Sequence, residues 1–99
     1  MKIEKKVIIK NKSGLHARPA SLFVQVANKY DCKIIVRKGR QKVNGKSIMG
    51  ILMLAAEKGT GIIITAEGGD ARAAVRELEG LLLGEAIEVY DEKKKKKKK

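Results

Sequence analysis

The chain has 99 residues, of which 43% are hydrophobic and 3% aromatic, and a formal net charge of +12. This length allows one domain with a modest core and is too short for two. The single cysteine, Cys32, excludes an internal disulfide and a cysteine-rich zinc site. Because aromatic residues are scarce, we expect an aliphatic core.

Charge is unevenly distributed along the sequence. Residues 1–46 carry a net charge of +11 and residues 47–92 a net charge of −6, while residues 93–99 are all lysine. A basic region favours acidic proteins, nucleic acid or anionic ligands as partners, although solvated surface lysines are also common. We expect a single domain over residues 1–92, followed at 93–99 by a disordered tail of the kind that an added tag gives.

Targeting and metal-binding signals are absent from the sequence. The amino-terminal ten residues lack the apolar run of a signal peptide, and no stretch reaches the roughly 18–20 apolar residues of a membrane span. We therefore expect a cytoplasmic protein without a membrane partner. One histidine and one cysteine leave no cluster of metal ligands, so no metal or cofactor is expected.

The first half of the chain predicts a strand, a helix and a β-hairpin. The elements follow in this order: a strand at 3–10, a turn at 11–14, a helix from Ala17 to about residues 30–31, and strands at 32–38 and 41–44 joined by a tight turn. The helix is indicated by apolar residues that recur at spacings of three and four: Pro19, Leu22, Phe23, Val26, Ala27 and Tyr30.

The second half predicts a short helix, a strand and a longer helix. In order, these are a helix that follows Ser47 and is broken at 59–61, a strand at 61–66, a turn at 68–70, and a helix from Ala71 that stops at Gly84. Ser47 and Asp70 are residue types that favour the position before a helix. The strand at 61–66 is the most apolar and should be central. Residues 87–90 predict a short extra strand or a loose extension.

The succession of elements defines a fold class. Four short strands and three amphipathic helices fit a two-layer α+β sandwich. A helical crossover does not make two strands parallel neighbours unless they are adjacent, so the pattern leaves the strand order open.

The segment SGLHARPAS, residues 13–21, predicts a helix start that can hold a phosphate. With His16 as the residue before the helix, the amides of Ala17 and Arg18 have no partner inside it. Gly14 allows a sharp entry, and Pro19 falls in the first turn, where its missing N–H costs nothing. The helix dipole and the Arg18 guanidinium both favour an anion at this point.

His16 supplies the candidate nucleophile at this predicted site. The positive potential around it favours a neutral imidazole, which is a nucleophile near neutral pH, and would stabilise a phosphoryl group attached to it. The alternative is a histidine that merely caps the helix or lies on the surface. A catalytic triad lacks an obvious partner set.

Ser47 and the apolar residues after it form a second candidate site. Ser47 can act as a helix cap alone, or as a phosphorylation site that adds negative charge beside a basic and apolar docking face. The apolar residues are too numerous for one narrow stripe, so we expect some to face a transient protein partner rather than the core: Ile48, Met49, Leu52 and Met53.

Together, GLHARPAS (14–21) and VNGKSIMGILML (43–54) strongly resemble the HPr family, the phosphocarriers of the bacterial phosphoenolpyruvate-dependent sugar phosphotransferase system. The resemblance covers roughly residues 2–85, and residues 86–92 form an extension without a counterpart. It implies an open-faced sandwich in which three helices cover one face of a four-stranded antiparallel sheet. It also implies that His16 carries a phosphoryl group on Nδ1, accepted from enzyme I and passed to enzyme IIA.

The same resemblance implies roles for the residues nearby. Arg18 would contact the phosphate, with Ser13 and the Ala17 amide beside it. Ser47 matches the residue that a serine kinase/phosphorylase modifies in many relatives for catabolite control through a transcription factor. Ile48, Met49 and Leu52 match the partner-binding patch. The protein would then be a carrier and not an independent enzyme. The sequence leaves the oligomeric state open, and we take a monomer as the default.

Two alternatives remain from the sequence. The segments GKS (45–47) and LAAEKGT (54–60) are also similar to the nitrogen-related branch of the family, which favours a regulatory phosphocarrier. The basic first half favours a nucleic-acid-binding module, but the sequence lacks interleaved aromatic residues and a Gly-x-x-Gly clamp. We therefore expect no direct binding to nucleic acid.

Overall fold

The computed structural model describes residues 1–10, 12 and 14–83. Its elements are, in chain order, β1 (Lys2–Ile8), α1 (Ala17–Ala27), β2 (Lys33–Lys38), β3 (Gln41–Asn44), α2 (Ile48–Leu54), β4 (Gly61–Glu67) and α3 (Ala71–Leu82). Three predictions lie outside the described residues: the helix stop at Gly84, the extension at 86–92, including the extra strand at 87–90, and the lysine tail.

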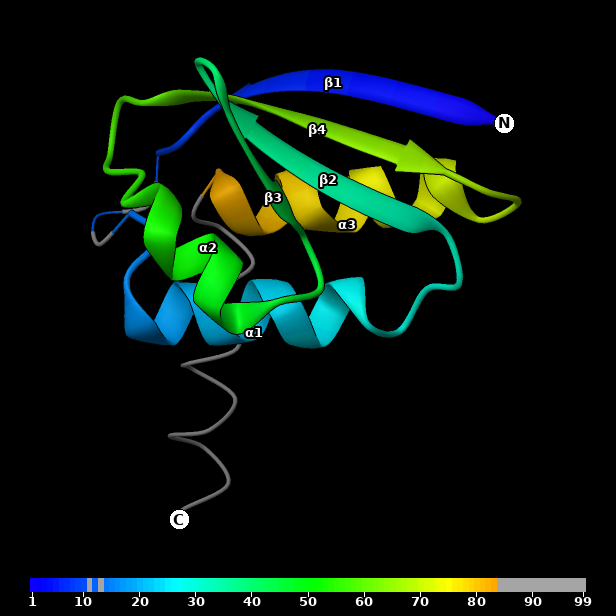
Figure 1. Cartoon of the computed structure of the whole chain (residues 1–99), viewed down its shortest axis with the longest axis horizontal. Coiled ribbons are helices and arrows are strands. Elements are labelled where there is room, and N and C mark those ends of the chain that lie inside the picture. The colour runs from blue at the N-terminus through cyan, green and yellow to red at the C-terminus, as the bar shows by residue number, and fades with distance from the viewer. Residues whose placement is uncertain (11, 13, 84–99) are drawn as a thin grey trace, which may run out of the picture.

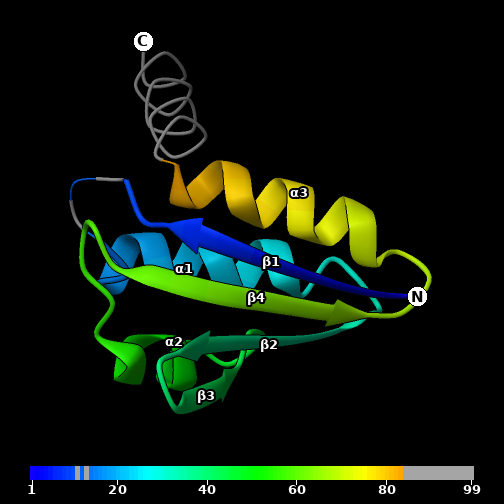
Figure 2. The same cartoon turned by 90° about the horizontal axis from the view of Figure 1, so that it is seen from above.

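The four strands form one antiparallel sheet in the order β1-β4-β2-β3. The strand predicted to be central, β4, lies between β1 and β2, so this prediction is confirmed. The three helices cover one face of the sheet (Figures 1 and 2), so the predicted open-faced α+β sandwich is confirmed. α3 packs against β1 and β4, and α1 packs against both α2 and α3.

The core lies between the sheet and the helices and is largely aliphatic. Alternate residues of β4 point into it, because side chains of a strand alternate between its two faces: Ile62, Ile64 and Ala66. Phe23 of α1 is fully buried and is the one aromatic residue among the buried residues of the described part. Each such buried aliphatic side chain stabilises the fold by about 1.5–3 kcal/mol relative to an exposed one.

Several element ends differ from the prediction. β1 ends at Ile8, because the amide of Lys10 bonds to the Leu82 carbonyl oxygen of α3 at 2.8 Å and the chain leaves the sheet. α1 ends at Ala27 rather than near residues 30–31. Tyr30 still packs against the core, and its hydroxyl donates to Glu77 of α3 at 2.5 Å.

The short helix α2 also ends earlier than the sequence suggests. It stops at Leu54, because Ala55 takes a left-handed conformation with φ of 49° and donates its N–H to the Leu52 carbonyl oxygen at 3.0 Å. The prediction that residues 59–61 break the helix was therefore wrong by about a turn. Alanine rarely adopts this conformation, so no local signal marked the end.

Asp70 occupies the predicted position before α3, but its side chain does not cap that helix. Its carboxylate instead accepts the amides of Asp31 at 2.8 Å and Cys32 at 3.0 Å, on the loop that precedes β2. The Asp31 amide is the main cause that holds the pKa of Asp70 below its usual value. Burial is the main cause that raises the pKa of the Cys32 thiol.

Candidate functional site

His16 lies immediately before α1, where the sequence predicted it. Its backbone is extended, with φ of −86° and ψ of −168°, and its carbonyl oxygen accepts the Ala20 amide at 2.8 Å, so it is the N-cap residue. The imidazole makes no capping hydrogen bond, and 60% of the side chain is exposed. The ring therefore faces solvent and is accessible to another protein.

The entry to α1 is held against the segment that follows α2. Gly14 has φ of +62°, and a Cβ there would lie 2.6 Å from the Ala56 carbonyl oxygen and 2.7 Å from Cα of Glu57. The next residue, Leu15, is buried and donates its N–H to the same Ala56 oxygen at 2.7 Å. The glycine is required both for the left-handed turn and for this close approach.

The first turn of α1 presents the other predicted phosphate-binding groups. Ala17 and Arg18 are its first two residues and are exposed, whereas Pro19 is buried. The first amides of a helix have no partner within it, and the helix dipole adds partial positive charge there. An anion at this end would meet amide donors, this dipole and the guanidinium of Arg18. Ser13, the remaining predicted contact, lies outside the described residues.

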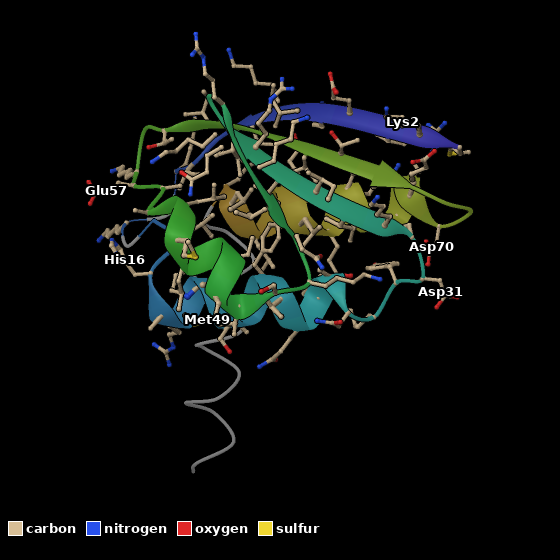
Figure 3. All side chains as sticks on the ribbon, viewed as in Figure 1. Lys2, His16, Asp31, Met49, Glu57 and Asp70 are labelled. Atoms are coloured by element: carbon tan, nitrogen blue, oxygen red, sulfur yellow. The ribbon has the colours of Figure 1, made fainter. Side chains whose placement is uncertain are left out.

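A carboxylate that the sequence reasoning did not find lies beside His16. Oε1 of Glu57 is 4.0 Å from Nε2 of His16, and 75% of the glutamate side chain is exposed. Figure 3 shows both residues at one end of the molecule, with Asp31 and Asp70 at the other. The antiparallel pairing of β1 with β4 brings the residues before β4 next to those after β1; because the sequence pattern leaves the strand order open, it carried no signal for this contact.

Ser47 precedes α2 as predicted, and its side chain is a true helix cap. Its Oγ accepts the Gly50 amide at 3.1 Å, and the residue is half-buried. Four of the apolar residues that follow are exposed, by 37–65%: Ile48, Met49, Leu52 and Met53. The inward face of α2 is supplied by Ile51 and Leu54 instead. The expectation that some of these apolar residues point outward is therefore confirmed.

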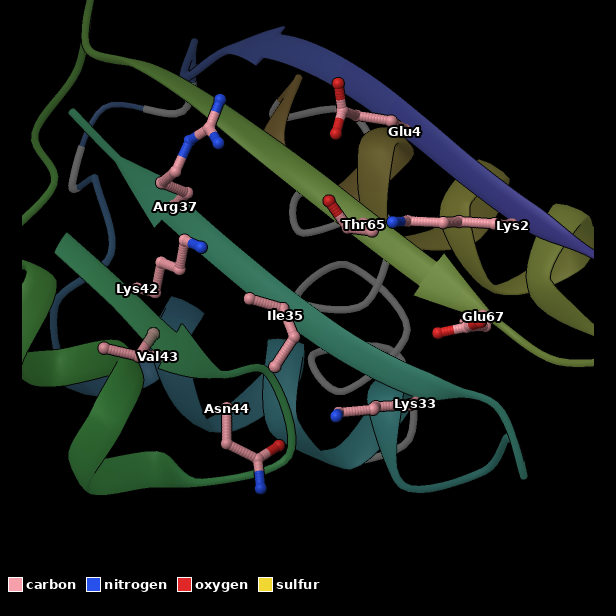
Figure 4. Close-up of a pocket in the computed structure, with 10 residues that line it drawn as sticks. All are labelled: Lys2, Glu4, Lys33, Ile35, Arg37, Lys42, Val43, Asn44, Thr65 and Glu67. Atoms are coloured by element: carbon pink, nitrogen blue, oxygen red, sulfur yellow. The ribbon is translucent and has the colours of Figure 1, made fainter. Parts of the chain in front are cut away.

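One hollow in the described residues lies on the open face of the sheet, away from the predicted site. It has a volume of about 470 Å³ and is lined by these residues (Figure 4): Lys2, Glu4, Lys33, Ile35, Arg37, Lys42, Val43, Asn44, Thr65 and Glu67. Neither His16 nor Ser47 lines it. The candidate site is thus an exposed helix end rather than part of this hollow.

Other kinds of site were also considered. Across residues 1–10, 12 and 14–83, His, Cys, Asp and Glu side chains do not form a group of three or more that would hold a metal ion. None of the helices in this part of the chain has the length and apolar character needed to cross a membrane.

Comparison with known proteins gives the class of the molecule. A family model described as the phosphorylation site of the HPr component of the phosphotransferase system matches residues 3–83. The HPr-like protein Crh of Halalkalibacterium halodurans is 47% identical over 76 residues, which are 77% of this chain and 90% of that protein. The fold and the matched sequence therefore define a small phosphocarrier-type protein.

Solved structures agree with this assignment. The crystal structure of the phosphocarrier protein HPr from Bacillus anthracis is 46% identical, with a TM-score of 0.80 over 82% of this chain and 96% of that one. A structure of Crh from Bacillus subtilis, described as a catabolite repression protein that forms a swapped dimer, is 41% identical, with a TM-score of 0.68 over 84% and 95%. The chain belongs to the HPr family of phosphotransferase-system proteins.

Proposed function

We propose that the protein is a phosphoryl carrier that accepts a phosphoryl group from enzyme I on Nδ1 of His16 and passes it to enzyme IIA of sugar transporters. The observation that supports this most directly is the exposed imidazole at the start of α1, which makes no capping bond of its own. Such a ring can reach the active sites of two different partner proteins in turn.

The surroundings of His16 suit the phosphorylated state. The amide of Ala17 and the guanidinium of Arg18 lie in the first turn of α1, and Ser13 precedes it in the sequence. Donors that are already oriented towards the new charge need no rearrangement when the group arrives. The carrier needs partner enzymes both to load and to remove the phosphoryl group, so we propose a shuttle and not an independent enzyme. We propose that it acts as a monomer in the cytoplasm.

This proposal is tested by incubating the purified chain with phosphoenolpyruvate and catalytic enzyme I. Intact-mass measurement should show one acid-labile phosphoryl group, and subsequent addition of enzyme IIA should remove it. His16→Ala should accept none, while Ser47→Ala should accept as much as the wild type. Labelling of the His16→Ala variant would show that the site lies elsewhere.

We also propose that Ser47 is phosphorylated by an ATP-dependent serine kinase/phosphorylase, and that a catabolite-control transcription factor binds the product. The similarity to a catabolite repression protein favours this second function. A phosphate at Ser47 would lie at the helix start that its hydroxyl now caps, next to the exposed side chains of Ile48 and Met49. Negative charge there would repel acidic partners.

The regulatory proposal has its own test. Reaction with a purified kinase of this type and ATP should add an acid-stable phosphate to the wild type and none to Ser47→Ala. The modified protein should then accept a phosphoryl group from enzyme I more slowly, and it should bind the transcription factor more tightly than the unmodified protein does. An unmodified Ser47 under these conditions would remove this function and leave the carrier function intact.

A further inference from the structure

We propose that Glu57 is a positioning residue for the phosphoryl transfer, and that its carboxylate keeps a proton on Nε2 of His16 so that the Nδ1 lone pair is free to attack. The inference rests on the proposed carrier function. Its basis is the placement of Oε1 of Glu57 at 4.0 Å from Nε2 of His16. The nitrogen that faces the carboxylate is thus the one that would not receive the phosphoryl group.

The backbone of Glu57 is fixed on both sides, so this placement is built into the fold. On one side the segment packs on Gly14, which has no Cβ to keep Glu57 away, as described above. On the other side a tight turn closes, with the Glu57 amide donating to Oγ1 of Thr60 at 3.2 Å and the Thr60 amide donating to the Glu57 carbonyl oxygen at 2.9 Å. The amide of Gly59 bonds to the Ile9 carbonyl oxygen at 2.7 Å, which ties the turn to the end of β1.

The two side chains need only a small rotation to form a hydrogen bond. A separation of 4.0 Å between Nε2 and Oε1 is about 1 Å too long for one. Both side chains are exposed, and such side chains change rotamer freely. The proton position on a histidine is set by the hydrogen bond that its other nitrogen makes. A carboxylate that accepts from Nε2–H therefore selects the form in which Nδ1 carries the lone pair.

The same carboxylate helps during the transfer. The Nδ1 lone pair forms the bond to phosphorus, and the bond from phosphorus to the donor's leaving atom breaks, with its electron pair going to that atom. The imidazole then carries a positive charge, with the proton still on Nε2. A neighbouring carboxylate stabilises this cation, as the aspartate does in a catalytic triad. When the phosphoryl group leaves, its bonding pair returns to Nδ1 and the neutral ring is regenerated.

Glu57 also repels the phosphoryl group, so the sign of its net effect depends on distance. The proton on Nε2 is the nearer charge. The phosphorus would be attached to the other ring nitrogen, and Arg18 lies two residues further on, in the first turn of α1. The phosphoryl group carries close to two negative charges, so the greater distance does not decide the sign by itself. We expect the carboxylate to favour the phosphorylated state because the start of α1 and the charge of Arg18 neutralise part of the phosphoryl charge. The contact is exposed, so the expected effect is modest, about two- to five-fold.

The test is the position of the phosphoryl-transfer equilibrium. The chain is mixed with catalytic enzyme I and fixed ratios of phosphoenolpyruvate to pyruvate, and the phosphorylated fraction is measured by intact mass. Glu57→Gln should lower the ratio of phosphorylated to free protein about two- to five-fold, Glu57→Lys should lower it further, and Glu57→Asp should restore part of it. Because a catalyst does not shift an equilibrium, a role in docking to enzyme I would not produce this pattern.

A matched control and a second measurement complete the test. Glu67→Gln removes a carboxylate from the far end of β4, at the other end of the strand from Glu57, and should leave the ratio unchanged. Nitrogen-15 NMR of the unphosphorylated protein should show less proton on Nε2 in Glu57→Gln than in the wild type. An unchanged or raised ratio in Glu57→Gln and Glu57→Lys would overturn the inference. Failure of the wild type itself to accept a phosphoryl group would instead overturn the carrier function.

Discussion

The amino-terminal ends of α1 and α2 use the same backbone arrangement for different purposes. Each is preceded by one extended residue, His16 or Ser47. The hydroxyl of Ser47 accepts an amide of its own helix, whereas the ring of His16 makes no such bond. A side chain that caps its helix contributes to stability, whereas the exposed ring of His16 makes no such contribution.

The start of α3 shows a third use of the same position. There, the carboxylate of Asp70 is directed away from its helix and holds the loop at Asp31 and Cys32. The three helix starts therefore separate three kinds of contact: an exposed ring without a capping bond at His16, a local cap at Ser47 and bonds to a distant loop at Asp70. The separation can be tested with single substitutions.

The largest effect is expected from Gly14→Ala, which disturbs the entry to α1. A side chain there must adopt a left-handed conformation and meets backbone atoms of Ala56 and Glu57, so the free energy of unfolding should fall by about 2–4 kcal/mol. Gly39→Ala is the matched control, because its φ is also positive at 58° but nothing lies within 4 Å of the added Cβ. Urea denaturation that gives equal losses for both variants would show that the close approach is unimportant.

The next effect concerns Asp70, whose carboxylate holds two amides. The folded-state pKa lies below the usual value of 3.8, so the carboxylate stabilises the fold above that pH and loses this effect as the pH falls through the folded-state pKa. Asp70→Ala should therefore lower the melting temperature at pH 6, and the difference from the wild type should shrink under more acidic conditions. Thermal melts from pH 6 down to about pH 2.5 test this, and a difference independent of pH would contradict it.

Ser47→Ala and His16→Ala compare the first two helix starts directly. Loss of the Ser47 cap should reduce the free energy of unfolding by about 1 kcal/mol. Loss of the His16 ring should change it by less than about 0.5 kcal/mol, because an exposed side chain without a capping bond contributes little. Chemical denaturation of both variants measures the difference. If His16→Ala proved as destabilising as Ser47→Ala, the two starts would not differ in the way described.

The smallest effect on stability is expected from Met49→Ser on the exposed face of α2. Its side chain is 65% exposed, so the free energy of unfolding should be almost unchanged. If Met49 contacts enzyme I, the KM of enzyme I for this protein should rise about five-fold, which corresponds to about 1 kcal/mol. Leu83→Ser is the control, because Leu83 is also an exposed apolar residue, at 39%, and lies at the end of α3 rather than on α2. An unchanged KM in Met49→Ser would remove this residue from the patch.

Local patterns predicted much of this molecule. Apolar spacing and cap residue types identified the starts of α1 and α2, and the strongly apolar composition of β4 identified a central strand. These features depend on interactions between residues a few positions apart, which the sequence displays directly. The antiparallel arrangement of the sheet, by contrast, was implied by the family resemblance and not by the pattern.

The features that the sequence did not predict share a different cause, because each of them depends on contacts between distant segments. Glu57 comes near His16 only because β1 and β4 pair and Gly14 admits the loop. The carboxylate of Asp70 accepts the amides of Asp31 and Cys32, which lie 39 and 38 positions earlier in the sequence. α2 ends at Leu54 because the chain must then reach the buried Ala56 and bond to Leu15, although alanine does not favour that turn.

Ala55 is the one non-glycine residue with a positive φ among the residues for which the structure is described. A left-handed backbone costs an alanine about 1–2 kcal/mol relative to glycine. The backbone at Ala55 is therefore strained, and relief of this strain would stabilise the fold. The position lies at the junction between α2 and the loop that carries Glu57. Ala55→Gly would adopt the same backbone conformation without this penalty, and it removes only the exposed methyl group of Ala55 from the surface.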